Sequence, residues 1–153
     1  MNNATDRIEI RRADWPADAA GIRAVRQEVF VREQNIPASL EWDGRDPDCF
    51  HLLALTRDQQ AVGTLRLGRN GRVGRMAVLR PYRHRGIGSA LLDSVVALAE
   101  KQGMTTLFLN AQHQTTGFYR RFGFAPNGPM FEEAGIPHQR MQLTVQPTSK
   151  PVT

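Results

Sequence analysis

One short segment combines arginines and glycines in a spacing that could hold an anion. It runs from Val78 to Ser89 and reads Val-Leu-Arg-Pro-Tyr-Arg-His-Arg-Gly-Ile-Gly-Ser. Gly86 and Gly88 allow the backbone to turn sharply and to approach a ligand closely. The segment joins a predicted strand to a predicted helix, whose first N–H groups are unpaired and lie at the positive end of the helix dipole. Such a turn favours a pyrophosphate, and Arg83 and Arg85 add positive charge.

Other side chains are candidates for proton transfer. Tyr119 lies in the segment Phe-Tyr-Arg-Arg-Phe-Gly-Phe at residues 118–124. Four residues are candidates for a general base: Glu28, Glu33, His51 and His138. No His, Asp or Glu pair has the spacing of a metal motif such as H-E-x-x-H, and the single Cys49 cannot build a cysteine zinc site. We therefore predict no metal.

The hydrophobic pattern predicts the elements that position these residues. Alternation predicts a strand at 8–10, and apolar residues at helical spacing predict a helix from about 17 to 32. The rest of the pattern predicts strands at 50–56, 61–67 and 73–79, a helix at 86–103, a strand at 105–111, a short helix at 116–121 and a last strand at 141–145. This order predicts an α+β or mixed α/β fold around one sheet.

Length and composition place these elements in one domain. The chain has 153 residues, of which 41% are hydrophobic, as expected for a globular domain with one core. We predict a single domain over residues 1–153, with a core at about 7–145 and a frayed tail at 146–153. No apolar run reaches the ~18 residues of a membrane span, and residues 1–7 lack the apolar stretch of a secretory signal. A cytoplasmic protein that does not contact membranes is therefore expected.

Charge is distributed unevenly along the chain. The net charge is +5, and seven arginines but no acidic residue lie between Asp58 and Asp93. Upstream, four acidic residues lie close together: Glu41, Asp43, Asp46 and Asp48. The basic stretch indicates an anionic ligand, and the acidic loop hints at a cationic one. Arginines along a strand point to alternate faces and no RNA-recognition aromatic motif is present, so nucleic acid is not the expected partner.

Two of the segments described above resemble, in this order, the motifs of a known enzyme family. Residues 83–88 are similar to the Q/R-x-x-G-x-G/A loop with which the GCN5-related N-acetyltransferases (GNAT) bind the pyrophosphate of acetyl-CoA. Residues 118–124 resemble the F-Y-x-x-x-G-F segment of the same family. The resemblance covers residues 7 to 145. It implies a twisted, mixed and mostly antiparallel sheet flanked by helices, with two strands splayed apart at the acyl-CoA site.

The likeness is closer to the ElaA-like branch of that family. Residues 29–34 match its V-F-V-x-E-Q, residues 43–51 match its acidic loop and histidine, and residues 132–141 match a later signature. The chain departs from the wider family at Gln112, where many members have Asn, and at Thr115, where Ala is usual.

The resemblance implies transfer of an acetyl group from acetyl-CoA, as co-substrate, to a primary amine by direct attack. Met76, Ala77 and Val78 would offer backbone groups to the pantetheine arm, and the Val78 N–H would polarise the thioester carbonyl. Gln112 would hydrogen-bond the same arm. Tyr119 would contact CoA and protonate the departing thiolate as general acid. The pyrophosphate loop would comprise Arg83, His84, Arg85, Gly86, Ile87, Gly88 and Ser89.

The amine side of the reaction is less defined. An amine with a pKa of ~10.4 is mostly protonated at neutral pH, so a base would help. Glu33 and His138 are the preferred candidates because they lie in segments that the branch resemblance includes, and a base that acts through water is equally open. The acceptor would be a small-molecule or peptide amine. Homodimers are common in the family, so a homodimer is a further expectation.

Two other functions stay open at this point. One is an acyl-CoA-binding sensor without turnover, against which the intact Tyr119 argues. The other is an acyltransferase like the acyl-homoserine lactone synthases, because the spacing of Arg26, Phe30 and the acidic residues 41–46 is similar to theirs. The chain is short for such an enzyme, and those enzymes lack the pyrophosphate loop found here.

Overall fold

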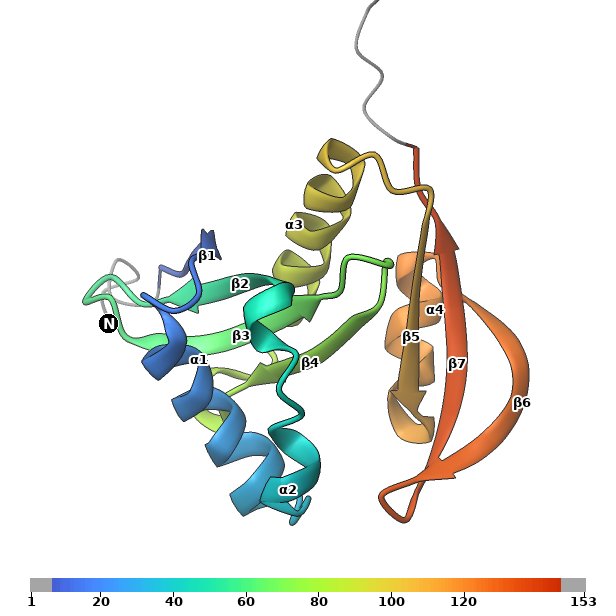
Figure 1. The fold of residues 1–153 in the computed structure, drawn as a ribbon, viewed down its shortest axis with the longest axis horizontal. Coiled ribbons are helices and arrows are strands. Elements are labelled where there is room, and N and C mark those ends of the chain that lie inside the picture. Colours follow the sequence, from blue (N-terminus) through green and yellow to red (C-terminus); the bar gives the residue numbers. More distant parts are fainter. Residues whose placement is uncertain (1–6, 147–153) are drawn as a thin grey trace, which may run out of the picture. The chain divides into compact units, whose positions relative to one another are not determined.

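The computed structural model describes residues 7–146, so all but the first residue of the expected frayed tail lies outside the described residues. Figure 1 shows the fold. By its internal contacts the chain divides into two compact units. Unit 1 contains the residues up to Arg69 and Arg75–Val95, and unit 2 contains Asn70–Gly74 and the residues from Val96 onward.

Unit 1 is built on a sheet with the strand order β1-β2-β3-β4. The strands are β1 (Glu9–Ala13), β2 (Phe50–Leu55), β3 (Ala61–Leu67) and β4 (Val73–Val78), the last of which begins in unit 2. β2 is antiparallel to both β1 and β3. Nearly every residue of β2 and β3 is buried, including the polar His51, Thr64 and Arg66.

The first helix of unit 1 is not regular over its whole length. α1 (Ala19–Arg26) continues as a π-helix, η2 (Gln27–Glu33), where a single helix was predicted. α1 packs against β3 through buried residues that include Ile22 and Val25. Three short helices follow in unit 1: α2 (Ala38–Glu41), η3 (Asp46–Asp48) and η4 (Arg80–Tyr82).

One long helix contributes residues to both units. α3 (Ile87–Lys101) begins and ends close to the predicted bounds. Its apolar face includes Leu91, Leu92 and Val95, which have no exposed surface. The chain leaves the helix at Gly103, whose φ of 78° favours glycine. No helix within residues 7–146 is both long and apolar enough to cross a membrane.

Unit 2 contains a second antiparallel sheet, in which β7 (Ile136–Thr144) lies between β5 (Thr106–Gln112) and β6 (Ala125–Glu133). The short helices η5 (His113–Thr115) and α4 (Thr116–Phe122) follow β5, and α4 lies against this strand. The core of the unit includes Leu107, Phe124 and Met141. A tight turn through Ala134 and Gly135, with φ of 54° and 75°, joins β6 to β7.

The prediction for the end of the chain was wrong in two respects. It contained one strand at 141–145, whereas β7 already begins at Ile136 and β6 precedes it. Pro126, Gly128 and Pro129 interrupt the strand pattern of β6, and its register with β7 shifts between Pro126 and Met130. Such a strand shows no clean alternation in sequence. His138 therefore lies within a strand and not in a loop.

Candidate functional site

The segment between β4 and α3 forms a sharp turn that ends at the helix N-terminus. The backbone is left-handed at His84 (φ 64°) and at Gly86 (φ 83°). A Cβ at Gly86 would meet no atom within 4 Å, so the conformation rather than the space favours glycine there. The Ala90 N–H donates to the Gly86 carbonyl at 3.0 Å, one helical turn back. The three preceding N–H groups, at Ile87, Gly88 and Ser89, have no acceptor within α3 and lie at the positive end of its dipole.

Arg83 is held by the protein at three points. Its Nε donates to the Val78 carbonyl at 2.8 Å, and its Nη1 and Nη2 donate to the two carboxylate oxygens of Glu33 at 2.6 and 2.7 Å. Arg80 donates to the same carboxylate at 3.1 Å. The hydrogen bond from Arg83 lowers the pKa of Glu33. Arg83 thus ties the end of β4 to η2, and Glu33 is a weaker base than an ordinary glutamate.

Several groups in the segment lie at the surface. His84, Arg85, Gly86 and Ser89 are exposed, whereas Ile87 is buried in the core. The Arg85 guanidinium lies over the Tyr82 ring, 5.4 Å from its centroid. An open pocket of about 620 Å³ adjoins the segment, and it is lined by Glu28, Arg32, Glu33, Leu79, Arg80 and Pro81. The turn therefore presents N–H groups and cationic side chains next to a recess.

The end of β4 carries the backbone groups predicted to bind the pantetheine arm. Ala77 is buried, and Met76 and Val78 are half-buried. The Leu79 N–H donates to the Val62 carbonyl of β3 at 2.9 Å. Because successive residues of a strand direct their N–H groups to opposite sides, the Val78 N–H points away from β3. Arg75, earlier in the same strand, has a φ of 49°, so β4 is irregular just before these residues.

In unit 2, Tyr119 lies on α4 among aromatic rings. Its ring meets those of Phe118 and Phe124 edge to face, with centroids 5.1 and 5.8 Å apart. Burial raises the pKa of Tyr119 to about 12. The phenol is therefore protonated at neutral pH and is a hydrogen-bond donor.

His138 lies in β7 directly opposite Gln112 of β5. Its Nδ1 is 2.7 Å from the Ile136 carbonyl, and its ring stacks on Phe131 with centroids 5.8 Å apart. A carbonyl can only accept, so Nδ1 carries the proton and Nε2 of the neutral ring carries the lone pair. Unit 2 thus places His138, a predicted base, next to Gln112, which was predicted to hydrogen-bond the pantetheine arm.

Three of the four residues of the acidic loop belong to an ion network that sequence reasoning missed. We call it the buried ion network because four of its members are buried: Arg26, Glu41, Asp46 and Arg66. Arg26 has no exposed surface and donates to Glu41 and Asp46, both at 2.7 Å. Arg66 donates to Asp43 at 2.8 Å and to Asp46 at 3.0 Å. Arg75 lies 3.2 Å from carboxylate oxygens of Glu41 and Asp43. The six members of the buried ion network are Arg26, Glu41, Asp43, Asp46, Arg66 and Arg75.

This network changes the interpretation of the acidic loop. Three of its four acidic residues are paired with arginines of the same unit, so the loop gives no support for a cationic acceptor. His51 belongs to the surroundings of the network, because its Nε2 donates to the Asp46 carbonyl at 2.8 Å and burial lowers its pKa. The signal available in sequence was the presence of arginines at positions with buried periodicity, Arg26 in the helix and Arg66 in the strand.

The remaining candidates have simpler surroundings. Glu28 forms a surface ion pair with Arg32 at 3.1 Å. Burial raises the pKa of Cys49, so the thiol is protonated at neutral pH. Among residues 7–146, no three His, Cys, Asp or Glu residues are grouped in a way that could hold a metal ion.

Comparison with known proteins identifies the class. A family model described as an acetyltransferase (GNAT) domain matches residues 18–145, a stretch that includes residues of both units. The chain is 33% identical over 120 residues to the uncharacterized N-acetyltransferase YjcF of Bacillus subtilis, covering 76% of this chain and 86% of that protein. The chain belongs to the GNAT acetyltransferase family.

Solved structures agree with this assignment. An acyl-CoA N-acyltransferase from Pseudomonas aeruginosa is 29% identical with a TM-score of 0.79, covering 90% of this chain and 99% of that chain. Escherichia coli ElaA is 27% identical with a TM-score of 0.80, at the same coverage of both chains. The predicted α+β GNAT fold and the likeness to ElaA are confirmed, but the strands form two sheets where one was predicted. Family membership implies that the protein uses an acyl-CoA and an amine acceptor.

Proposed function

We propose that this protein transfers the acetyl group of acetyl-CoA to a primary amine of a small molecule or peptide. The observation that carries the proposal is the turn at residues 83–89. Three helix N-terminal N–H groups, two left-handed residues and the exposed Arg85 lie together there. Backbone N–H groups at a helix N-terminus are suited to a pyrophosphate. Arg83 holds the turn in place through Glu33 and Val78.

Acyl transfer requires stabilisation of the charge that develops on the thioester oxygen. The amine nitrogen attacks the carbonyl carbon, the C–S bond breaks, and the CoA sulfur leaves as a thiolate. The Val78 N–H donates to the developing oxyanion, a role supported by its direction away from β3. Met76, Ala77 and Gln112 hydrogen-bond the pantetheine arm. These groups act on the acyl donor whatever the acceptor is.

Tyr119 supplies the hydrogen bond that the departing thiolate needs. Its phenol stays protonated over the physiological range because burial raises its pKa to about 12. With this pKa of Tyr119, complete proton transfer to a CoA thiolate, whose thiol has a pKa of ~8.5, would be unfavourable by about 5 kcal/mol. We therefore assign Tyr119 as the donor that stabilises the thiolate by a hydrogen bond and protonates it as the product leaves, after which the phenolate takes a proton from water.

His138 removes the proton from the amine, either directly or through water. The hydrogen bond from Nδ1 to Ile136 leaves the lone pair on Nε2, as a base requires. Glu33 was an equal candidate by sequence. Its ion pair with Arg83 and its lowered pKa favour a different part, in which Glu33 positions the pyrophosphate loop.

The two alternative functions receive less support. The acidic residues whose spacing is similar to that of lactone synthases are members of the buried ion network, which explains their presence without a special substrate. A sensor without turnover would not need a phenol with the properties of Tyr119. Binding and turnover are therefore tested separately.

The first test is acetyl-CoA binding by a Ser89→Glu variant. A carboxylate in the first turn of α3 is favourable for the helix dipole, but it repels a pyrophosphate at the same N–H groups. We expect unchanged or slightly higher thermal stability and a Kd for acetyl-CoA that rises at least about tenfold. Ala97→Glu makes the same charge change at an exposed position later in α3, and its Kd should stay within about twofold of wild type. Equal affinity of the two variants would contradict the loop assignment.

The second test is release of free CoA thiol from acetyl-CoA in the presence of amines. A panel of polyamines, amino acids and lysine-containing peptides covers the two acceptor classes. Thiol release that depends on one of these amines would support the enzyme. Tight acetyl-CoA binding without thiol release in any mixture would support the sensor instead.

A further inference from the structure

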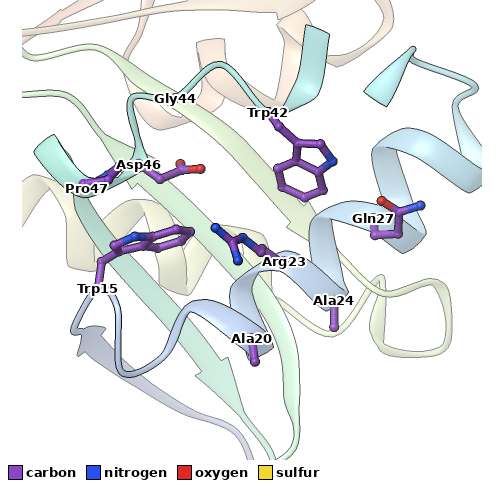
Figure 2. Close-up of a pocket in the computed structure, with 9 residues that line it drawn as sticks. All are labelled: Trp15, Ala20, Arg23, Ala24, Gln27, Trp42, Gly44, Asp46 and Pro47. Atoms are coloured by element: carbon purple, nitrogen blue, oxygen red, sulfur yellow. The ribbon is translucent and has the colours of Figure 1, made fainter. Parts of the chain in front are cut away.

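A second pocket lies on the outer surface of α1, apart from the residues assigned to acyl transfer. It has a volume of about 660 Å³ and is open to solvent, and its lining residues are shown in Figure 2: Trp15, Ala20, Arg23, Ala24, Gln27, Trp42, Gly44, Asp46 and Pro47. All of them belong to unit 1. The volume falls within the range of small-molecule sites, about 300–1,000 Å³. No residue proposed above for CoA or acyl transfer lines this pocket.

Both tryptophans of the chain line the pocket, and each indole ring contacts a buried side chain of unit 1. Trp15 stacks on the buried His51 with ring centroids 5.1 Å apart. The buried guanidinium of Arg26 lies over Trp42, 4.9 Å from the ring centroid. Both indoles are only half-buried. Each indole therefore keeps an exposed part, and both line the same pocket.

The charge available in the pocket is positive. The guanidinium of Arg23 is held over the Trp15 ring, 5.0 Å from the centroid, and lies between the two indoles in Figure 2. Within the described part of the chain Arg23 forms no ion pair. Asp46 is the acidic residue of the lining, and its carboxylate already accepts hydrogen bonds from Arg26 and Arg66. An anion would therefore find a partner in this pocket, whereas a cation would meet Arg23.

We propose that this pocket binds a small molecule that carries an aromatic ring and a carboxylate. The ring packs against the indoles, and the carboxylate accepts hydrogen bonds from Arg23, whose planar guanidinium suits a carboxylate. Ala20 and Ala24 contribute small, exposed side chains to the lining, and Gln27 contributes an amide. This proposal does not depend on the acetyltransferase activity, because it concerns a different set of residues.

Tryptophan fluorescence gives a direct readout, since Trp15 and Trp42 are the two tryptophans of the protein. Three probes share one phenyl ring and differ in charge: phenylacetate, phenylacetamide and phenethylamine. Each is titrated to about 10 mM, which detects even millimolar affinity. We expect phenylacetate to change the emission saturably. Phenylacetamide should bind at least about fivefold more weakly than phenylacetate, and phenethylamine more weakly still. Equal affinity for the three probes, the tightest binding by phenethylamine, or no response to any would overturn the proposal.

Two variants and a control locate the binding. Arg23→Gln should weaken phenylacetate binding at least about fivefold. Arg57→Gln removes the same charge from an exposed turn of unit 1 and should leave the Kd within about twofold. Ala24→Leu keeps a strong helix former on an exposed helix position but fills the pocket, so the saturable response should disappear. Equal losses in the Arg23 and Arg57 variants, or full binding by the Ala24 variant, would place the ligand elsewhere and contradict the proposal.

Discussion

Unit 1 has two arginine-rich regions that a count of charges does not distinguish. In the buried ion network, three arginines meet three carboxylates at distances from 2.7 to 3.2 Å. In the segment at residues 80–89, Arg80 and Arg83 share the single carboxylate of Glu33, and Arg85 lies on the surface over a tyrosine ring. In the first region every charged side chain has an oppositely charged partner within unit 1. The second leaves helix N-terminal N–H groups at the surface.

The difference follows from the surroundings of each charge. Removing an ion from water costs several kcal/mol, so buried charges persist only where every one has partners. Exposed ion pairs contribute at most about 1 kcal/mol and can exchange a protein partner for a ligand. A change in the buried ion network should therefore affect stability, whereas a change at the candidate site should affect binding or rate.

The largest effect is expected from Asp46→Ala, which breaks the centre of the buried ion network. The carboxylate of Asp46 accepts hydrogen bonds from both Arg26 and Arg66. Its loss leaves two buried guanidinium groups with one fewer partner each. We expect the free energy of unfolding to fall by about 3–5 kcal/mol, measured by urea denaturation followed by circular dichroism.

A matched variant and a pH series test the same prediction. Asp58→Ala, in the exposed turn between β2 and β3, should change the stability by no more than about 0.5 kcal/mol. Burial alone would raise the pKa of Asp46, but the hydrogen bonds from Arg26 and Arg66 outweigh it and lower the pKa. The contribution of Asp46 is thus present above pH ~4 and is lost as the pH falls through its lowered pKa. A loss below about 1 kcal/mol in Asp46→Ala would show that the network behaves like a surface cluster.

The sequence predicted those parts of the fold that depend on local periodicity. The strands near 50–56, 61–67 and 73–79 and the long helix α3 were found because their apolar patterns are regular over their whole length. β6 was missed because Pro126, Gly128 and Pro129 break its pattern. The π-helical turns of η2 were missed because their side-chain pattern does not differ enough from that of an α-helix.

Functional residues, too, could be predicted where they lie close together in the sequence and not where they lie far apart. The glycines of the proposed pyrophosphate loop, Gly86 and Gly88, lie two residues apart, so their joint effect is visible in sequence. The ion pairs join residues that are far apart: Arg26 with Asp46 across 20 residues, Arg66 with Asp43 across 23, and Arg83 with Glu33 across 50. Charge alone does not tell which arginine meets which carboxylate. The acidic loop was therefore interpreted as a hint of a cationic ligand, whereas three of its four acidic residues pair with arginines of the same unit.

Tyr119→Phe should give the next largest effect, and it should affect rate rather than stability. Loss of the donor to the departing thiolate should lower kcat about a hundredfold. The Kd for acetyl-CoA should stay within about twofold, because the aromatic ring remains between Phe118 and Phe124. The measurement combines thiol-release kinetics with a binding titration, and a thermal melt should show little change.

The other tyrosine of the chain provides the control. Tyr82→Phe removes a hydroxyl that has no assigned role and keeps the ring beneath Arg85, so kcat should change by less than about twofold. Because the pKa of Tyr119 is about 12, its ionisation should not limit the wild-type rate below about pH 10. Full activity of Tyr119→Phe would mean that the thiolate takes its proton from water.

The smallest effect is expected from Glu33→Gln, which tests whether Glu33 positions the loop at residues 83–89 or acts as the general base. A glutamine can accept one hydrogen bond from Arg83 but loses the charge-assisted pair of bonds at 2.6 and 2.7 Å. If Glu33 positions the loop, the KM for acetyl-CoA should rise about three- to tenfold with little change in kcat. The pH profile of kcat should also keep its shape, because no titrating catalytic group has been removed.

A general base at Glu33 would give a different result. In that case Glu33→Gln would lower kcat about a hundredfold or more, and the acidic limb of the pH profile would disappear. Glu28→Gln is the matched control, since Glu28 lies on the same π-helix and forms an exposed pair with Arg32; its KM and kcat should both stay within about twofold of wild type. If Glu33→Gln changes KM alone, the Glu33–Arg83 ion pair positions the acetyl-CoA loop, much as the buried ion network stabilises the core. If it lowers kcat instead, Glu33 takes part in proton transfer.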